Sequence, residues 1–169
     1  MLRLVIWVWL LVLVGWPAEL GADEVFKLNH RSRTSPDAMI TEVRITDRET
    51  IVQIEYRNTT GPGWVRVFPP GGKHSFFLMD KQSSRKYTLT KNRGVPVYPK
   101  KAVVNKGSRL SLTLWFKAVP FSKYDLLEGD VAPEEGKSWH FYDIDLQGDW
   151  REFADDGEPP KMISNAPGE

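Results

Sequence analysis

The sequence has 169 residues, of which 41% are hydrophobic and 27% are charged, and its formal net charge is +1 at pH 7. A chain of this size and composition is expected to fold around one hydrophobic core. The near-neutral charge argues against a nucleic-acid partner, which would require a strongly basic face. Because the chain has no cysteine, disulfides, thiol catalysis and cysteine-based zinc sites are excluded.

The N-terminus is typical of a secretory signal peptide over residues 1–22. Arg3 supplies a positive charge, and an uncharged apolar run from Leu4 to Gly15, expected to be helical, ends at Trp16-Pro17. Cleavage is predicted after Ala22. The apolar run is shorter than the ~20 residues that a membrane-spanning helix needs, so retention as an anchor is the less favoured alternative. We therefore expect no membrane span after cleavage.

The first strands are predicted soon after the signal, beginning with an edge strand at Val25–Leu28. Two longer segments then alternate apolar and polar residues, as do strands that bury one face. Their predicted buried faces are Met39, Thr41, Val43 and Ile45 in the first segment and Val52, Ile54 and Tyr56 in the second. The turn residues Asp47–Glu49 lie between the two segments, which are therefore predicted to form an antiparallel hairpin.

The later strands follow the same alternation. Strands are predicted at Trp64–Phe68, His74–Met79 and Arg85–Thr90. The clearest of all is Leu110–Lys117, whose predicted buried face is Leu110, Leu112, Leu114 and Phe116. Its other face is polar except for Trp115. A last strand at Ser138–Leu146 is expected to bury Tyr142, Ile144 and Leu146 and to expose Asp143 and Asp145.

These patterns predict an all-β fold of about eight or nine strands with turns between them and no helix after the signal. We interpret residues 23–148 as an immunoglobulin-like antiparallel β-sandwich. A closed barrel is the alternative, because strand number does not separate two packed sheets from one rolled sheet. Residues 149–169 are rich in acidic residues, proline and glycine, and a disordered tail is expected there.

A series of short motifs runs through these strands and turns: Phe77–Asp80, Tyr87–Leu89, Gly94–Pro96, Lys106–Gly107, Leu110–Lys117, Tyr124–Gly129 and Trp139–Ile144. Between Ser35 and Leu146 this series resembles a group of exported bacterial immunoglobulin-like domains of unknown function. The resemblance implies a fold and an exported location. It implies no catalytic residues.

The sequence offers few candidates for catalysis or metal binding. His30, His74 and His140 lack the spacing of metal-binding motifs, and the Gly-x-Ser-x-Gly pattern of hydrolases is absent. Acidic residues, including Glu128, gather between Asp125 and Asp149, without the spacing of a calcium-binding loop. We interpret them as a solvated acidic edge. No catalytic residue, metal or cofactor is predicted.

Aromatic residues supply the candidate binding site. Trp115 lies on the polar face of its strand, Trp64 lies between glycine-containing loops, and Phe121 follows a proline. Exposed aromatic side chains stack on sugar rings or anchor protein partners. The structural alternative is that Trp115 lies under a second layer and that Trp64 caps the end of the fold.

The function predicted from the sequence is that of an exported, non-enzymatic interaction domain, periplasmic or extracellular. Its partner is expected to be a protein of the envelope or of the extracellular space, bound through Trp64, Trp115 and Phe121. The alternative is a glycan-binding module that uses exposed aromatics. An enzyme is the least favoured hypothesis, since it would require a pocket of hydrogen-bonded polar side chains.

Overall fold

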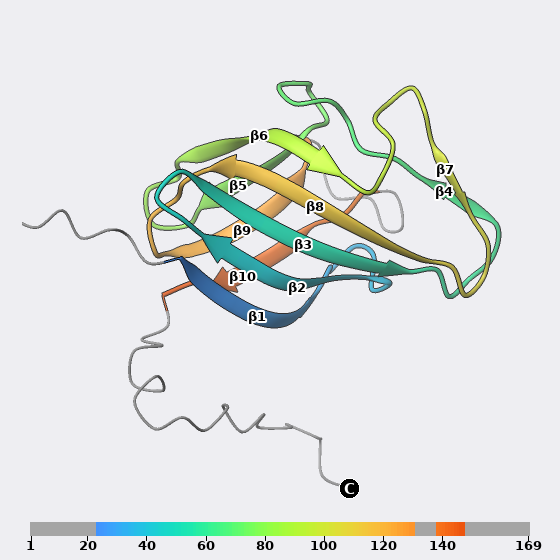
Figure 1. Cartoon of the computed structure of the whole chain (residues 1–169), viewed down its shortest axis with the longest axis horizontal. Coiled ribbons are helices and arrows are strands. Elements are labelled where there is room, and N and C mark those ends of the chain that lie inside the picture. The colour runs from blue at the N-terminus through green and yellow to red at the C-terminus, as the bar shows by residue number, and fades with distance from the viewer. Residues whose placement is uncertain (1–22, 131–137, 148–169) are drawn as a thin grey trace, which may run out of the picture.

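The computed structural model describes residues 23–130 and 138–147 (Figure 1). The predicted signal peptide (residues 1–22) and the predicted tail (residues 149–169) lie outside the described residues. The described part of the chain contains ten strands and no helix. The all-β prediction is therefore confirmed.

The strands have the following bounds: β1 (Glu24–Arg31), β2 (Ala38–Ile45), β3 (Glu49–Arg57), β4 (Gly63–Val65), β5 (Phe76–Asp80), β6 (Lys86–Arg93), β7 (Ala102–Val104), β8 (Arg109–Lys117), β9 (Lys123–Glu128) and β10 (Phe141–Asp145). Eight of them form one sheet in the order β1-β2-β3-β8-β6-β5-β9-β10. Every neighbouring pair in this sheet is antiparallel. The short strands β4 and β7 form a separate pair beside it.

The eight-stranded sheet curves until its two edge strands approach each other at one end. The Arg33 amide, just after β1, donates a hydrogen bond to the His140 carbonyl at 2.9 Å, just before β10. Ser32 Oγ donates to the same carbonyl at 3.0 Å. In Figure 1, β2, β3 and β8 pass in front of β5, β9 and β10. The structure thus establishes one curved antiparallel sheet. The more specific prediction, an immunoglobulin-like sandwich of two sheets, stays a prediction.

Strand β8 lies near the middle of the sheet, between β3 and β6. Leu112, Leu114 and Phe116 are fully buried, as predicted, because alternate residues of a strand point to the same face. They belong to one hydrophobic cluster that also contains Val52 of β3 and Leu126 of β9. Replacing one buried leucine of such a core by alanine typically costs about 2–5 kcal/mol.

The predicted buried face of β2 is wrong in its first half. Ala38 and Ile40 are buried, whereas Met39 and Thr41 are only half-buried. The reason is a β-bulge, since Ile40 pairs with Ile54 and the next pair is Glu42 with Gln53, which leaves Thr41 as an extra residue. A bulge shifts the alternation by one residue. Beyond it, Val43 and Ile45 are buried as predicted.

A second β-bulge lies in β10, and because of it the buried face predicted for this strand is wrong at Tyr142. Phe141 pairs with Leu126 and Ile144 pairs with Tyr124, so two residues of β10 lie opposite one residue of β9. Asp143 within this bulge has a positive φ of 59°. Phe141 and Ile144 are buried, and Tyr142, predicted to be buried, is half-exposed. Leu146 is buried as predicted.

Strand β6 extends further than predicted, through Arg93 to a tight approach at Gly94. Gly94 has a φ of 99°, and a Cβ atom there would lie 1.9 Å from the Ser111 carbonyl oxygen of β8. Only glycine fits so close to a neighbouring backbone at this dihedral angle. Two strands are not predicted from the sequence: the short strand β7, which pairs with β4, and β9, whose residues suggest a bend.

Candidate functional site

A cleft of about 580 Å³ lies at the end of the sheet where β3 and β9 end and β10 begins. This volume is within the ~300–1,000 Å³ of small-ligand sites. The residues that give the cleft its chemical character are Tyr56, Trp64, Arg66, Phe68, Glu128 and Trp139. They come from segments far apart in the sequence, and we refer to this site as the Trp64 cleft.

One wall of the Trp64 cleft is the segment that begins with β4. Val65 and Val67 are buried, whereas Trp64 is 52% exposed and Phe68 is half-buried. This is strand-like alternation, and it places Trp64, Arg66 and Phe68 on the same side of the segment. The Tyr98 amide donates to the Val67 carbonyl at 2.8 Å, which holds the segment beside a second connection.

The Arg66 guanidinium is surrounded by aromatic rings. Its central carbon lies 4.6 Å from the centre of the Trp64 ring, 4.7 Å from that of Tyr98 and 5.3 Å from that of Phe68. Cation–π contacts of this kind fix the plane of the guanidinium. Nε of Arg66 is buried and has no hydrogen-bond partner among the described residues. Because this Nε is buried, a ligand in the cleft would meet the terminal NH₂ groups of the guanidinium rather than Nε.

Glu128, the last residue of β9, supplies a carboxyl group to the same cleft. One of its oxygens, Oε2, accepts a hydrogen bond from the Trp139 backbone amide at 2.9 Å. Burial raises the pKa of Glu128 to about 7, although the Trp139 hydrogen bond and the charge of Arg66 both act to lower it. The Trp64 cleft thus holds a carboxyl group that changes its charge near neutral pH, beside a permanent cation.

Two stacked aromatic rings form another part of the lining. The rings of Tyr56 and Trp139 lie 5.2 Å apart between centres at an angle of 22°. Burial, and to a lesser degree the charge of Asp37, raises the pKa of the Tyr56 hydroxyl, so this group stays protonated. The two side chains present a rigid apolar surface with one hydroxyl group.

His140 contacts the backbone of Glu128, one of the residues that line the cleft. Its Nε2 lies 3.2 Å from the Glu128 carbonyl oxygen and its Nδ1 lies 3.1 Å from the Tyr142 hydroxyl. A neutral imidazole satisfies both contacts when Nε2–H donates to the carbonyl and Nδ1 accepts from the hydroxyl. Because both ring nitrogens are engaged, this histidine fixes the end of β9 and is not available to a metal ion or a substrate.

Asn58 shapes the loop that follows β3 and leads into the cleft. It is buried, and its side-chain nitrogen donates to the Gly61 carbonyl at 2.6 Å. Its side-chain oxygen accepts from the Thr60 amide at 3.2 Å. Asparagine is suited to this position because its side-chain amide can both donate to and accept from backbone groups of the turn that lack a backbone partner.

The three aromatic residues predicted as anchors lie on separate surfaces. Trp64 is at the Trp64 cleft. Trp115 is half-buried on the outward face of β8, with Lys91 Nζ 4.7 Å from the centre of its ring. Phe121 is 52% exposed near the start of β9, and its ring centre is 6.1 Å from that of Phe26. The structure therefore does not unite them in one site.

Sequence reasoning missed Tyr56, Arg66, Glu128 and Trp139 as members of the cleft. The alternation of Trp64, Arg66 and Phe68 could have identified Arg66, because every second residue of a strand shares a side. No such signal marks Glu128 or Trp139. They meet the others only through the pairing of β9 with β10 and the curvature of the sheet.

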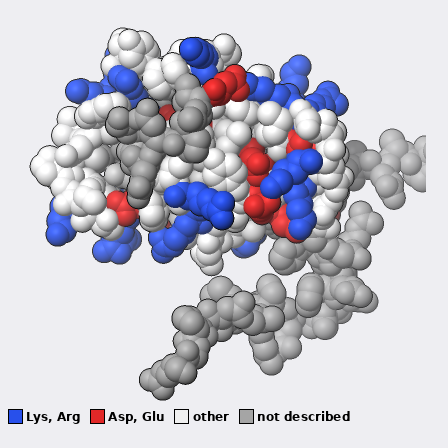
Figure 2. All heavy atoms as spheres, turned by 180° about the vertical axis from the view of Figure 1, so that it is seen from behind, with Lys and Arg blue, Asp and Glu red and all other residues white. Residues whose placement is uncertain are grey.

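The acidic edge predicted from the sequence is largely a set of ion pairs with lysine. Lys81 contacts Asp143 and lies 3.8 Å from Asp125, and Lys123 lies 3.0 Å from Asp145. Figure 2 shows acidic and basic side chains beside each other on this face. Glu128 does not belong to that edge, since its carboxyl group is buried in the cleft. Within the described residues, no group of three or more histidine or acidic side chains is placed to hold a metal ion.

Comparison with known proteins gives no match to a family model, to a curated protein or to a solved structure. The resemblance to exported immunoglobulin-like domains therefore stays a prediction. In residues 23–130 and 138–147, no helix has the length and apolar character to cross a membrane.

Proposed function

We propose that this protein is an exported, non-enzymatic binding domain whose ligand, a glycan, enters the Trp64 cleft. Export is inferred from the N-terminal apolar run that begins after Arg3. We also infer that the curved sheet is an immunoglobulin-like sandwich, since the residues that it buries form one cluster between strands distant in sequence.

The observation that carries this proposal is the presence, in one cleft, of a guanidinium group and a carboxyl group beside exposed aromatic surface. Arg66 and Glu128 both line the cleft, and Glu128 has one oxygen bound to the Trp139 amide. Adjacent hydroxyl groups of a sugar ring accept from a guanidinium and donate to a carboxylate. Trp64 and the stacked pair of Tyr56 and Trp139 provide flat surfaces for the apolar face of the ring.

The shape of the site favours a glycan over the protein partner that the sequence suggests as the first hypothesis. Protein interfaces of standard size bury about 800 Å² on each partner and cluster their aromatic anchors. Here Trp115 and Phe121 lie on other elements than Trp64, and the concave site is a cleft of about 580 Å³. A few sugar rings fit such a volume better than a folded partner does.

The single acidic residue among the described lining of the cleft supports a binding role rather than hydrolysis of the glycan. Glycosidases of the common type need two carboxyl groups roughly 5–9.5 Å apart on either side of the bond that is cut. Among the described residues that line the Trp64 cleft, Glu128 is the only acid. A single carboxyl group with a pKa of about 7 is suited to hold a hydroxyl group, and so is the Arg66 guanidinium in the same cleft.

The test is calorimetric titration of the protein with neutral oligosaccharides derived from chitin, dextran and mannan, and with a panel of short peptides. We expect at least one oligosaccharide series to bind, and Trp64→Ala to weaken that binding about fivefold through loss of aromatic contact. Phe121→Ala is the matched control, because both side chains are 52% exposed. Binding of peptides alone, or an equal loss in the Phe121 variant, would contradict the proposal.

A further inference from the structure

We propose that the outer face of the sheet carries a second binding site, a groove between Arg44 and Arg93 that takes an acidic polysaccharide. This inference is independent of the Trp64 cleft, since no residue lines both sites. It rests on the arrangement of side chains across β2, β3, β8 and β6, which are adjacent in the sheet.

The groove has a volume of about 400 Å³ and runs across the strands. The pairing of the strands places Arg44 opposite Ile51, Ile51 opposite Trp115, and Trp115 opposite Lys91. This row has apolar side chains between two cations, of which only Arg44 lines the groove. Arg44 on β2 and Arg93 on β6, which both line it, are likewise three strand spacings apart across the sheet, or about 14 Å. A ligand that spans this distance is an extended chain rather than a single small ion.

The charged side chains that line the groove are both basic. Its charged lining residues are Arg44 and Arg93, and no acidic residue lines it. Arg93 is exposed and forms no ion pair with a described residue. Guanidinium groups bind carboxylate, sulfate and phosphate through paired hydrogen bonds. The groove is therefore complementary to an anionic ligand.

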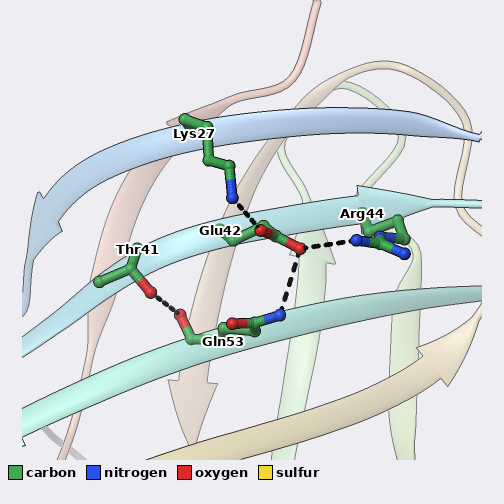
Figure 3. Close-up of polar contacts among 5 residues, drawn as sticks. All are labelled: Lys27, Thr41, Glu42, Arg44 and Gln53. Atoms are coloured by element: carbon green, nitrogen blue, oxygen red, sulfur yellow. Dashed lines mark hydrogen bonds and ion pairs between the residues drawn. The ribbon is translucent and has the colours of Figure 1, made fainter.

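Arg44 is held at the edge of the groove by a buried carboxylate. Figure 3 shows Lys27, Arg44 and Gln53 directed at the Glu42 side chain. An oxygen of Glu42 lies 3.3 Å from the Arg44 guanidinium and 3.1 Å from the Gln53 amide nitrogen, and Lys27 binds the other oxygen. Burial of such a carboxylate requires several partners. The remaining N–H groups of Arg44 stay available to a ligand.

The uncharged part of the groove favours a sugar chain over other polyanions. Gln53, Ser111 and Thr113 line it between the arginines, and Trp115 adds an aromatic ring. These side chains bind hydroxyl groups and the apolar face of a sugar. Double-stranded nucleic acid demands a strongly basic protein, whereas this chain has a formal net charge of +1. A membrane surface would require apolar side chains that protrude.

The experiment titrates the full chain at low salt with an oligogalacturonate and, separately, with dextran sulfate, which distinguish a carboxylate from a sulfate. Unmodified dextran is the uncharged reference. We expect at least one acidic sugar to bind, and Arg93→Gln to weaken it about tenfold, as expected for loss of a charge-assisted contact. Arg57→Gln is the matched control, because Arg57 is exposed on the outward face of β3 and does not line the groove. It should change the affinity less than twofold.

Three results would overturn the inference. One is the absence of binding to both acidic sugars. Another is an equal loss of affinity in Arg57→Gln, which would indicate diffuse attraction to a charged surface. The last is binding to a DNA duplex or to anionic phospholipid vesicles that is as tight as binding to the acidic sugars. Titration of each variant with the neutral oligosaccharides separates the two sites, because Arg93→Gln should leave binding at the Trp64 cleft unchanged.

Discussion

Two glutamates of this protein respond to their surroundings in opposite directions. Burial dominates at Glu128 and raises its pKa to about 7. Ion pairing dominates at Glu42, where the hydrogen bond from Lys27 and the charges of Lys27 and Arg44 outweigh burial and lower the pKa. The first residue is suited to exchange a proton near neutral pH and the second to stay charged. The same type of side chain is thus proposed to bind a ligand at the Trp64 cleft and stabilises the pairing of β1, β2 and β3 at the other site.

Glu128 should make the protein less stable as the pH rises. Because its pKa is higher in the folded state than the ordinary 4.5, the folded protein binds an extra proton between pH 4.5 and about 7. The free energy of unfolding should therefore fall over this range. Glu128→Gln should remove this contribution to the pH dependence. At pH 8 the variant should be more stable than the wild type by on the order of 1–2 kcal/mol, less than the full shift implies because the side chain is half-exposed. Urea denaturation at pH 4.5 and pH 8 measures this, and an unchanged pH dependence in the variant would refute it.

Glu42 should contribute with the opposite sign. Its pKa is lowered in the folded state, so its contribution is present above pH 4.5 and is lost as the pH falls through the folded-state value. Glu42→Gln should lower the free energy of unfolding at pH 7 by about 1–2 kcal/mol, because Lys27 and Arg44 lose their common partner. The control is Glu55→Gln, since Glu55 is exposed on β3. Equal stability of the two variants at pH 7 would contradict this account.

At the scale of elements, bulges set the limit of prediction from the sequence. The alternation of β3 and β8 is regular, and their faces were predicted correctly from Val52, Ile54, Leu112 and Leu114. In β2 and β10 an inserted residue shifts the alternation, and the face predicted on one side of the bulge is wrong. Thr41 is an ordinary strand residue, so nothing local distinguishes the bulge from a regular strand.

The junction of β6 and β8 should be intolerant of any side chain at Gly94. Gly94→Ala places a Cβ atom 1.9 Å from the Ser111 carbonyl oxygen and also strains a φ of 99°. We expect a loss of about 3 kcal/mol in unfolding free energy. Gly107→Ala is the control, since Gly107 has a φ of 85° but no atom within 4 Å of the added Cβ. Its cost should be only about 1 kcal/mol, and thermal unfolding that ranks the two variants equally would count against the close approach.

At the scale of the whole molecule, the sequence identified the class of fold and part of the candidate site. Strand periodicity and turn residues were enough for an all-β chain, because they are local signals. The Trp64 cleft joins the loop after β3 to the ends of β9 and β10, and such long-range contacts leave no local pattern. Trp64 was identified because it lies between glycine-containing loops in the sequence. Glu128 can be recognised as a cleft residue only from the folded structure, in which the end of β9 reaches the cleft.

The most direct test of the proposed function follows the tryptophan indole signals of the 15N-labelled protein by NMR during titration with the neutral oligosaccharide that binds best. Trp64 and Trp139 line the cleft, and Trp115 lies on the outward face of β8. The indole signals of Trp64 and Trp139 should shift with the same saturation curve, and that of Trp115 should not move. A shift confined to Trp115, or saturable binding that leaves both Trp64 and Trp139 unperturbed, would contradict the assignment of the cleft.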